Sequence, residues 1–173
     1  MTIKGIAAGI CACGLLSAGA PVAAAQLSKS DQAFVRMAAD ANMTEAHEGQ
    51  MAEDRAASQG VKDFAQKLIQ DHSNAYGKLL DLAQKNGESI PRGIDARRNP
   101  EIAQLSKLKG NAFDSRFIQD EVRDHEKTIA AFRNEAEHGQ NADLKSYANE
   151  ELSTLRDHLK IAQQLEKGSK GKS

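Results

Sequence analysis

Four residues with metal-ligand side chains interrupt the apolar positions of four segments that are predicted to be helical. They are Glu45, His72, His125 and His158. Each stands three or four residues from apolar residues of its own segment, the spacing at which side chains share one face of a helix. Counted from the turns that join the segments, all four lie near mid-helix. A carboxylate and three imidazoles that converge at one level have the ligand chemistry for Zn, Cu, Fe or Mn.

A polar network without a metal is the competing interpretation of this cluster, because histidine and glutamate also occur at helix interfaces as paired, partly hydrated groups. The di-iron carboxylate bundles carry Glu-x-x-His on two helices. Here Ile69 and Leu155 stand three residues before two of the histidines. The one literal match, Glu135 with His138, lies at a helix end, where a histidine interacts favourably with the helix dipole. The pattern leaves the metal site and the structural network both open.

An aspartate directly precedes each of the three histidines, at positions Asp71, Asp124 and Asp157. Adjacent residues of a helix do not face each other. Each aspartate could therefore orient only a histidine of a neighbouring helix, as a hydrogen-bond acceptor behind a metal ligand. The alternative is a solvated charge at the edge of the helix interface.

The elements that must position these residues are four amphipathic helices, because apolar residues recur at spacings of three and four. The expected helices cover residues 30–58, 61–86, 111–138 and 141–167. We expect Gly60 to stop the first helix, Gly87 to follow the second as its C′ residue, and Asn111 to cap the third. The fold class is therefore all-α.

The connection over residues 87–110 is much longer than the other two. Fully extended it could span roughly 79 Å, whereas a 26-residue helix is only about 39 Å long. It can cross the whole bundle and place the second and third helices parallel, which is the topology of a ferritin-like four-helix bundle with one long crossover. A short helical turn over residues 100–108 is expected to pack across the bundle.

Residues 1–25 have the pattern of a secretory signal peptide: Lys4, an apolar stretch from Ile6 to Leu16, and Ala23 to Ala25 as a cleavage site. Both cysteines, Cys11 and Cys13, fall inside this segment. The expected organisation is a signal peptide over 1–25, a four-helix domain over 26–167 and a disordered basic tail over 168–173. We expect a periplasmic protein without disulfides.

The charge of the chain is nearly balanced, with 23 Lys and Arg against 24 Asp and Glu. This balance gives no electrostatic reason to expect a nucleic-acid partner. No apolar stretch after residue 25 is long enough to span a membrane. The candidate partner is an envelope protein.

Several short segments resemble a known bacterial family, the exported ferritin-like proteins of the domain-of-unknown-function 4142 group. The segments are Asp31-Gln32-Ala33-Phe34 with Ala38-Ala39, Glu45, Val61-Lys62-x-Phe64-Ala65-Gln66, Asp71-His72, Gly110-x-x-Phe113-Asp114, Asp124-His125 and His158-Leu159. The resemblance implies a ferritin-like bundle in a periplasmic or outer-membrane-associated setting, and members are often labelled outer membrane proteins. It brings no established activity. The family usually has a proline in the last helix before the histidine, where this chain has Ser153.

Three classes of function follow from these observations. The first is a periplasmic bundle that binds a transition metal or protects against stress through Glu45, His72, His125 and His158. The second is a structural or interaction protein of the envelope with a polar core and no metal. The third is a metal-dependent oxidase or peroxide-consuming enzyme, although the sequence contains no complete catalytic motif.

The cleavage site generates the first prediction. The protein recovered from the periplasm should have the mass of a chain that begins at Gln26, as measured by intact-mass spectrometry. Recovery of the uncleaved chain, or of a chain with a lipid on Cys13, would contradict the expected export route.

Overall fold

The structure, a computed structural model, describes residues 26–170; the expected signal peptide and the last three residues of the expected tail lie outside this range. The described helices are α1 (Lys29–Arg55), α2 (Gln59–Lys85), α3 (Asn99–Leu105), α4 (Gly110–His138) and α5 (Ala142–Lys170), with a 3-10 turn η1 (Ala96–Arg98) before α3. The described part of the chain contains no strand. None of its helices combines the length and apolar character needed to cross a bilayer.

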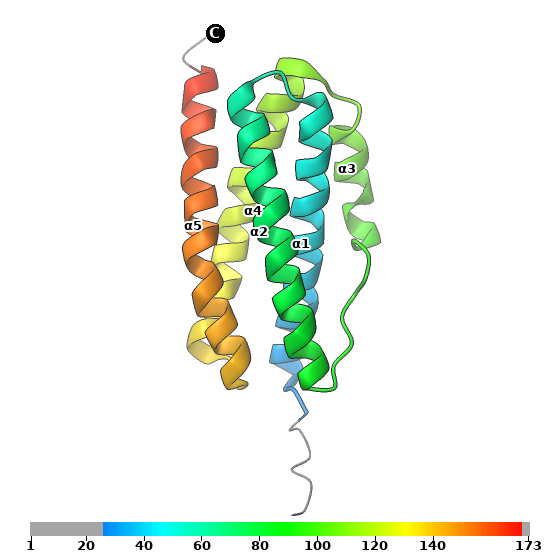
Figure 1. The fold of residues 1–173 in the computed structure, drawn as a ribbon, viewed down its shortest axis with the longest axis vertical. Helices are drawn as coiled ribbons and strands as arrows, with labels where there is room; N and C mark the ends of the chain where they lie inside the picture. The colour runs from blue at the N-terminus through cyan, green and yellow to red at the C-terminus, as the bar shows by residue number, and fades with distance from the viewer. Residues whose placement is uncertain (1–25, 171–173) are drawn as a thin grey trace, which may run out of the picture.

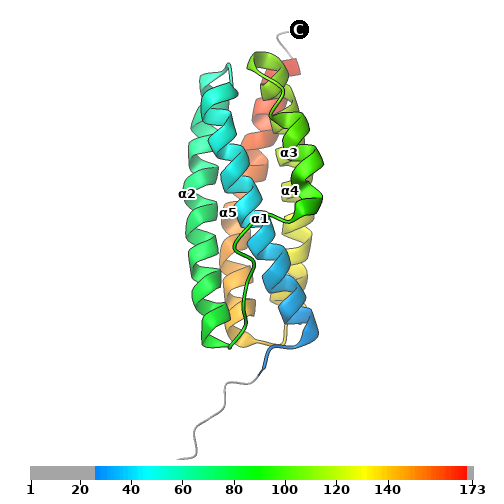
Figure 2. The same cartoon turned by 90° about the vertical axis from the view of Figure 1, so that its right-hand side faces the viewer.

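The four long helices form one bundle, and the long connection runs back along its side (Figure 1). Helix α1 packs mainly against α2, and α4 mainly against α5, with α1 also touching α4 and α2 touching α5. Between α2 and α4 the chain returns the full length of the bundle past α1, with α3 beside α1 and α4 (Figure 2). Helices α2 and α4 are therefore parallel, which confirms the predicted ferritin-like four-helix bundle with a long crossover.

Side-chain caps and a left-handed glycine define several of the helix ends. The hydroxyl of Ser28 accepts a hydrogen bond from the N–H of Asp31 at the start of α1, and Asn141 Oδ1 accepts one from Leu144 at the start of α5. Gly87 follows α2 with φ of 68°, a conformation that glycine adopts without a steric penalty. These contacts satisfy backbone groups that have no partner inside a helix.

Three expected helix ends differ in the structure. Helix α1 ends at Arg55 and Gly60 lies inside α2, because the Ser58 hydroxyl caps α2 by accepting from the N–H of Val61. Asn111 is not a cap: α4 begins at Gly110, whose φ of 63° turns the chain into the helix without a side-chain cap. Helix α5 is continuous past Ser153 and runs to Lys170, so it includes the first three residues of the expected tail.

Asp114, near the start of α4, holds the turn between two other helices. Its two carboxylate oxygens accept hydrogen bonds from the backbone N–H groups of Ala57 (3.0 Å) and Ser58 (2.9 Å). These residues form the turn between α1 and α2. The contact joins the start of α4 to the start of α2, which the parallel arrangement brings to the same end of the bundle.

The apolar core has two halves separated by a polar layer. One half contains Phe34, Leu79, Phe132, Leu144 and Tyr147 among its buried residues. The other contains Val61, Phe64, Leu68, Phe113 and Phe117. Between them lie buried polar residues that include Asn42, Glu45, His72, Glu121, His125 and His158. The two apolar halves hold the four helices at the level of this layer.

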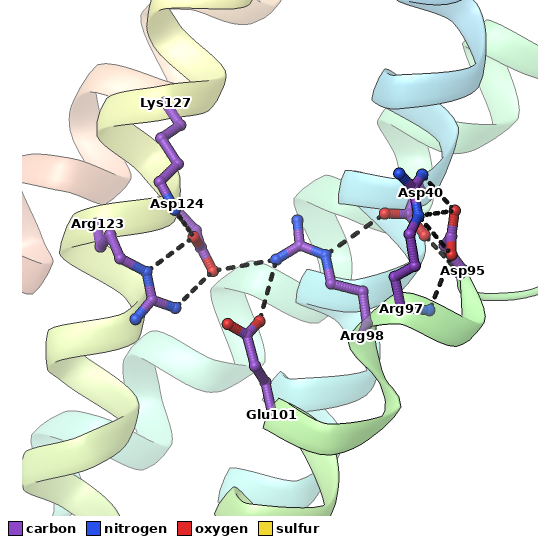
Figure 3. Close-up of polar contacts among 8 residues, drawn as sticks. All are labelled: Asp40, Asp95, Arg97, Arg98, Glu101, Arg123, Asp124 and Lys127. Carbon is purple, nitrogen blue, oxygen red and sulfur yellow. Dashed lines mark hydrogen bonds and ion pairs between the residues drawn. The ribbon is translucent and has the colours of Figure 1, made fainter.

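The crossover is attached to the bundle by charged residues (Figure 3). The backbone N–H of Asp95 donates to Asp40 of α1 at 2.6 Å. The Arg98 guanidinium lies between Asp40 and Asp124 of α4, 3.5 Å from a carboxylate oxygen of each. Glu101 of α3 lies 3.6 Å from the same guanidinium. Arg98 thereby links the crossover to two helices next to the polar layer.

Replacing Asp114 with alanine should destabilise the bundle. The variant removes the acceptor of two backbone N–H groups, so we expect a loss of about 1–3 kcal/mol and a Tm lowered by roughly 2–12 °C. Thermal melting followed by circular dichroism measures it. The control is Asp157→Ala, at an exposed position of α5, which should stay within about 0.5 kcal/mol of wild type. Equal effects of the two substitutions would contradict the role assigned to Asp114.

Candidate metal centre

The three predicted histidines meet in the polar layer. His72 comes from α2, His125 from α4 and His158 from α5, with exposed fractions of 4%, 1% and 0%. Their ring centroids lie 5.2 to 5.7 Å apart. One nitrogen from each ring lies within 4.8 Å of the other two. The helical spacing thus placed all three rings at one level, as predicted.

The hydrogen bonds of His72 assign its tautomer. The Tyr147 hydroxyl donates to the carbonyl of Ala75 at 3.2 Å and accepts from Asn42 Nδ2 at 3.3 Å. This leaves Asn42 Oδ1 facing His72 Nδ1 at 2.9 Å. Since an amide oxygen only accepts, Nδ1 of His72 carries the hydrogen. Its Nε2 is a lone-pair atom, fully buried and without a hydrogen-bond partner among the described residues.

His125 and His158 are fixed in the same way by acceptors outside the cluster. His125 Nδ1 lies 2.9 Å from the backbone carbonyl of Glu121, so it donates to that carbonyl. His158 Nε2 lies 2.9 Å from the carboxylate of Asp71 and donates to it. The remaining nitrogens, His125 Nε2 and His158 Nδ1, face each other at 3.2 Å. In neutral rings both are lone pairs, so no hydrogen is available to join them.

Each ring therefore keeps one lone-pair nitrogen, and one nitrogen of each ring lies within 4.8 Å of the other two. Two nitrogens bound to one tetrahedral ion at 2.0–2.1 Å lie about 3.3 Å apart. The 3.2 Å between His125 and His158 already matches this separation. An N–H bound to a carboxylate or carbonyl on the outer side of the ring is also what metal-bound histidines carry, because it fixes the ring and increases its basicity. The nitrogens of His125 and His158 thus already have the spacing of two metal ligands, and a nitrogen of His72 lies within 4.8 Å of them.

Burial keeps the imidazoles of His72 and His158 neutral. Loss of solvent, followed by the nearby His125 and His158 rings, lowers the pKa of His72 well below its usual value. Burial likewise lowers the pKa of His158 to about 4, although its hydrogen bond to Asp71 acts in the opposite direction. A neutral imidazole is the form that binds a metal. Both rings are therefore in the ligand form at neutral pH.

Of the three aspartates that precede the histidines, one has the role considered from the sequence. Asp71 of α2 accepts from His158 of α5 and is held at 2.8 Å by Lys67. Burial acts to raise the pKa of Asp71, but the hydrogen bonds from Lys67 and His158 outweigh it and lower the pKa. Asp124 instead pairs with Arg98, Arg123 and Lys127, and Asp157 is exposed.

Glu45, the fourth predicted ligand, lies in a neighbouring group. Its carboxylate, that of Glu121 and His125 offer ligand atoms within 4.8 Å of one another. Glu121 was missed from the sequence, although it stands one helical turn before His125 and shares its face. Burial, and then the nearby Glu121 carboxylate, raises the pKa of Glu45. His125 is thus common to a three-histidine group and a group with two carboxylates.

A small cavity reaches His72 between α2 and α5. It is lined by Asn42, Asp71, His72, Tyr147, Glu151 and Thr154 among others, and it has room for about one water molecule. Glu151 at its edge is paired with Lys78 at 2.8 Å. This cavity gives a water or a small ion a place next to His72.

Comparisons with known proteins bear on this arrangement. The sequence model of the family described as "Domain of unknown function (DUF4142)" matches residues 16–165. The chain belongs to this family. No curated protein matches this DUF4142 chain.

Two solved structures share the fold of this DUF4142 protein. One is titled "Crystal structure of DUF305 fragment from Deinococcus radiodurans"; it has a TM-score of 0.72 and 13% identity, covering 81% of this chain and 97% of that one. The other is titled "CopM in the Ag-bound form (by co-crystallization)", with a TM-score of 0.65 and 16% identity, covering 80% of this chain and 96% of that one. Identities this low show a common fold alone.

Glu48 of this DUF4142 protein provides a test of the electrostatics beside the centre. Burial, and then the carboxylates of Glu45 and Asp124, raises the pKa of Glu48 to about 8. The folded protein therefore keeps a proton on Glu48 that the unfolded chain releases near pH 4.5, so the contribution of this residue to stability falls as pH rises from about 4.5 to about 8. Because each pKa unit corresponds to about 1.4 kcal/mol, Glu48→Gln should match wild type near pH 4.5 and exceed it in stability by a few kcal/mol at pH 9.

Urea unfolding of chelator-treated protein at several pH values measures this difference. The control for loss of one charge is Glu53→Gln, at an exposed position of the same helix. A constant difference between Glu48→Gln and wild type over this pH range would contradict the assigned proton.

Proposed function

We propose that this protein binds a transition metal ion, copper or zinc, through His72, His125 and His158. The observation that carries the proposal is the orientation of the three rings: Asn42, the Glu121 carbonyl and Asp71 take up their N–H groups. One nitrogen of each ring lies within 4.8 Å of the other two. Imidazole nitrogens suit copper and zinc among the first-row metals.

Glu45 remains part of the proposal as a carboxylate beside the three imidazoles. It lies within 4.8 Å of the ligand atoms of His125 and Glu121, not in the group formed by the three rings. Three protein nitrogens leave a tetrahedral ion one further position, which is typical of a site that exchanges a ligand or a water.

The biological role that we propose is protective binding of metal outside the cytoplasm. The support is the export signal expected from residues 1–25 together with the fold shared with CopM, whose solved structure is titled as an Ag-bound form. Ag(I) and Cu(I) are both soft monovalent cations. A protein that binds such an ion in a buried site would keep it from reacting elsewhere in the envelope.

Metal should stabilise the folded protein, and this stabilisation should depend on the three histidines. Chelator-treated protein is titrated with Cu(I), Cu(II), Zn(II), Mn(II) and Fe(II), and melting is followed for each metal. At a free metal concentration of 100 times Kd the gain should be about 2.7 kcal/mol, or a Tm raised by roughly 5–10 °C. For Cu(I) and Cu(II), His72→Ala, His125→Ala and His158→Ala should each remove most of this gain, and for Zn(II) each should reduce it.

The chain contains two matched controls for these variants. His47→Ala, at a partly buried position, and His138→Ala, at the exposed end of α4, remove histidines outside the centre and should retain the full response. If no metal changes Tm and the isolated protein contains none, the polar layer is structural, and the envelope structural or interaction protein becomes the better interpretation.

A further inference from the structure

The neighbouring group, formed by Glu45, Glu121 and His125, contains three buried carboxylate oxygens that accept no hydrogen bond from the described residues. Glu45 and Glu121 have exposed fractions of 6% and 1%. Glu45 Oε2 and both carboxylate oxygens of Glu121 are buried and have no hydrogen-bond partner among the described residues. Buried carboxylate oxygens without a donor are rare, because water is lost and nothing replaces it.

The basic residues nearby are already engaged by other acids. Arg116 and Arg123 each lie 2.6 Å from Asp120. Arg98, Arg123 and Lys127 surround Asp124. Within residues 26–170, no lysine or arginine forms an ion pair with Glu45 or Glu121. The two carboxylates therefore face each other at the α1–α4 interface without a protein cation between them.

A metal ion fits the spacing of these groups. Oxygen and nitrogen ligands lie 2.0–2.2 Å from a divalent first-row ion, so ligands on opposite sides of it are about 4.2 Å apart. The ligand atoms of Glu45, Glu121 and His125 lie within 4.8 Å of one another. Adjacent ligands of such an ion lie about 3–3.5 Å apart, so side-chain movements of up to about 1 Å would bring all three into range. Two carboxylates with an imidazole favour a harder ion than three imidazoles do.

We propose that Glu45, Glu121 and His125 form a second cation site, next to the three-histidine site and sharing the ring of His125 with it. Its ligand class is a divalent ion of the Mn(II), Fe(II) or Zn(II) type. His125 links the two groups: Nε2 faces His158 at 3.2 Å, and Nδ1 lies 3.3 Å from Oε2 of Glu121. Nδ1 carries the hydrogen in the metal-free ring, so a cation bound at Nδ1 displaces this proton to solvent, and with both sites filled the ring bridges them as an imidazolate. The proposal goes beyond the proposed function, because the two carboxylates do not belong to the three-histidine group.

Mn(II) is the probe, and binding to chelator-treated protein is counted from the loss of the electron paramagnetic resonance signal of the free ion. Wild type should bind one Mn(II). Glu121→Gln and Glu45→Gln should each weaken this binding roughly tenfold or more, whereas His72→Ala should retain it. Zn(II) titrated by calorimetry should show two equivalents in wild type, one in Glu121→Gln and one in His72→Ala.

The matched control is Glu135→Gln. Glu135 is also buried, with an exposed fraction of 3% and one unpaired oxygen, but it lies beside Gly139 at the end of α4. Glu135→Gln should leave the numbers of bound Mn(II) and Zn(II) ions unchanged. Because glutamine keeps the shape of glutamate without its charge, the variants should fold, and circular dichroism verifies this. If Glu121→Gln misfolds, Glu45→Gln decides.

Absence of Mn(II) binding to wild type, or equal binding to Glu121→Gln and Glu135→Gln, would overturn the second site. If wild type binds no Mn(II) but still binds Zn(II) in a histidine-dependent way, the proposed function stands. The opposite pattern, with Mn(II) bound but no effect of His72→Ala on Zn(II), would contradict the three-histidine site alone. The failures of the two proposals are therefore distinguishable.

Discussion

Three imidazole rings are buried against one another, and each has one N–H group that needs a hydrogen-bond acceptor. The rest of the polar layer depends on where these acceptors lie. The N–H groups point outward to Asn42, to the carbonyl of Glu121 and to Asp71. An inward N–H would place a hydrogen between the rings, and an unpaired one would lose its hydration without compensation. The acceptors come from α1, α4 and α2, so the orientation of each ring requires those helices at one height. The layer is therefore also a constraint on the register of the bundle.

The long crossover makes this register possible in a chain of four helices. Because α2 and α4 run parallel, the starts of both helices lie at one end, where Asp114 binds the α1–α2 turn. The same return path brings Arg98 to Asp40 and Asp124. Asp124 is the residue before His125, so the crossover is attached close to the candidate centre. An up-and-down bundle with short loops would have neither contact.

The fold and the three histidines could be predicted from the sequence because both follow from periodicity. Apolar spacing defines a helix face, and His72, His125 and His158 occupy positions on those faces. The partners of the rings could not be predicted in this way. Asn42 reaches His72 across α1 and α2, and its amide orientation depends on Tyr147 of a third helix. Such contacts depend on the rotation of each helix about its axis, which spacing along one helix does not define.

Glu45 shows that an equal position along neighbouring helices does not by itself predict which side chains share a site. Equal height on neighbouring helices is necessary for a shared site, but a side chain must also point to the same side of a ring. Glu45 of α1 meets Glu121 and His125 of α4, while His72 meets Asn42, three residues earlier on α1. Helix ends were missed for a similar reason. The positive φ of Gly110 starts α4, and nothing in the side-chain pattern of Asn111 and Asp114 distinguishes a cap from a contact with a distant turn.

The polar layer also has more hydrogen-bond acceptors than donors, which a purely structural layer would avoid. Every ring N–H in it has an acceptor, whereas His72 Nε2, Glu45 Oε2 and both oxygens of Glu121 have no donor. Buried ionic groups are often replaceable by apolar residues without loss of stability, so stability alone does not require them. A proton can bridge one pair of these acceptors. The acceptors form two groups that meet at His125. One cation can contact several of these acceptors at once, whereas a proton joins only two. A cation bound to the three histidines would also reduce the electrostatic repulsion between the nearby carboxylates of Glu45 and Glu121.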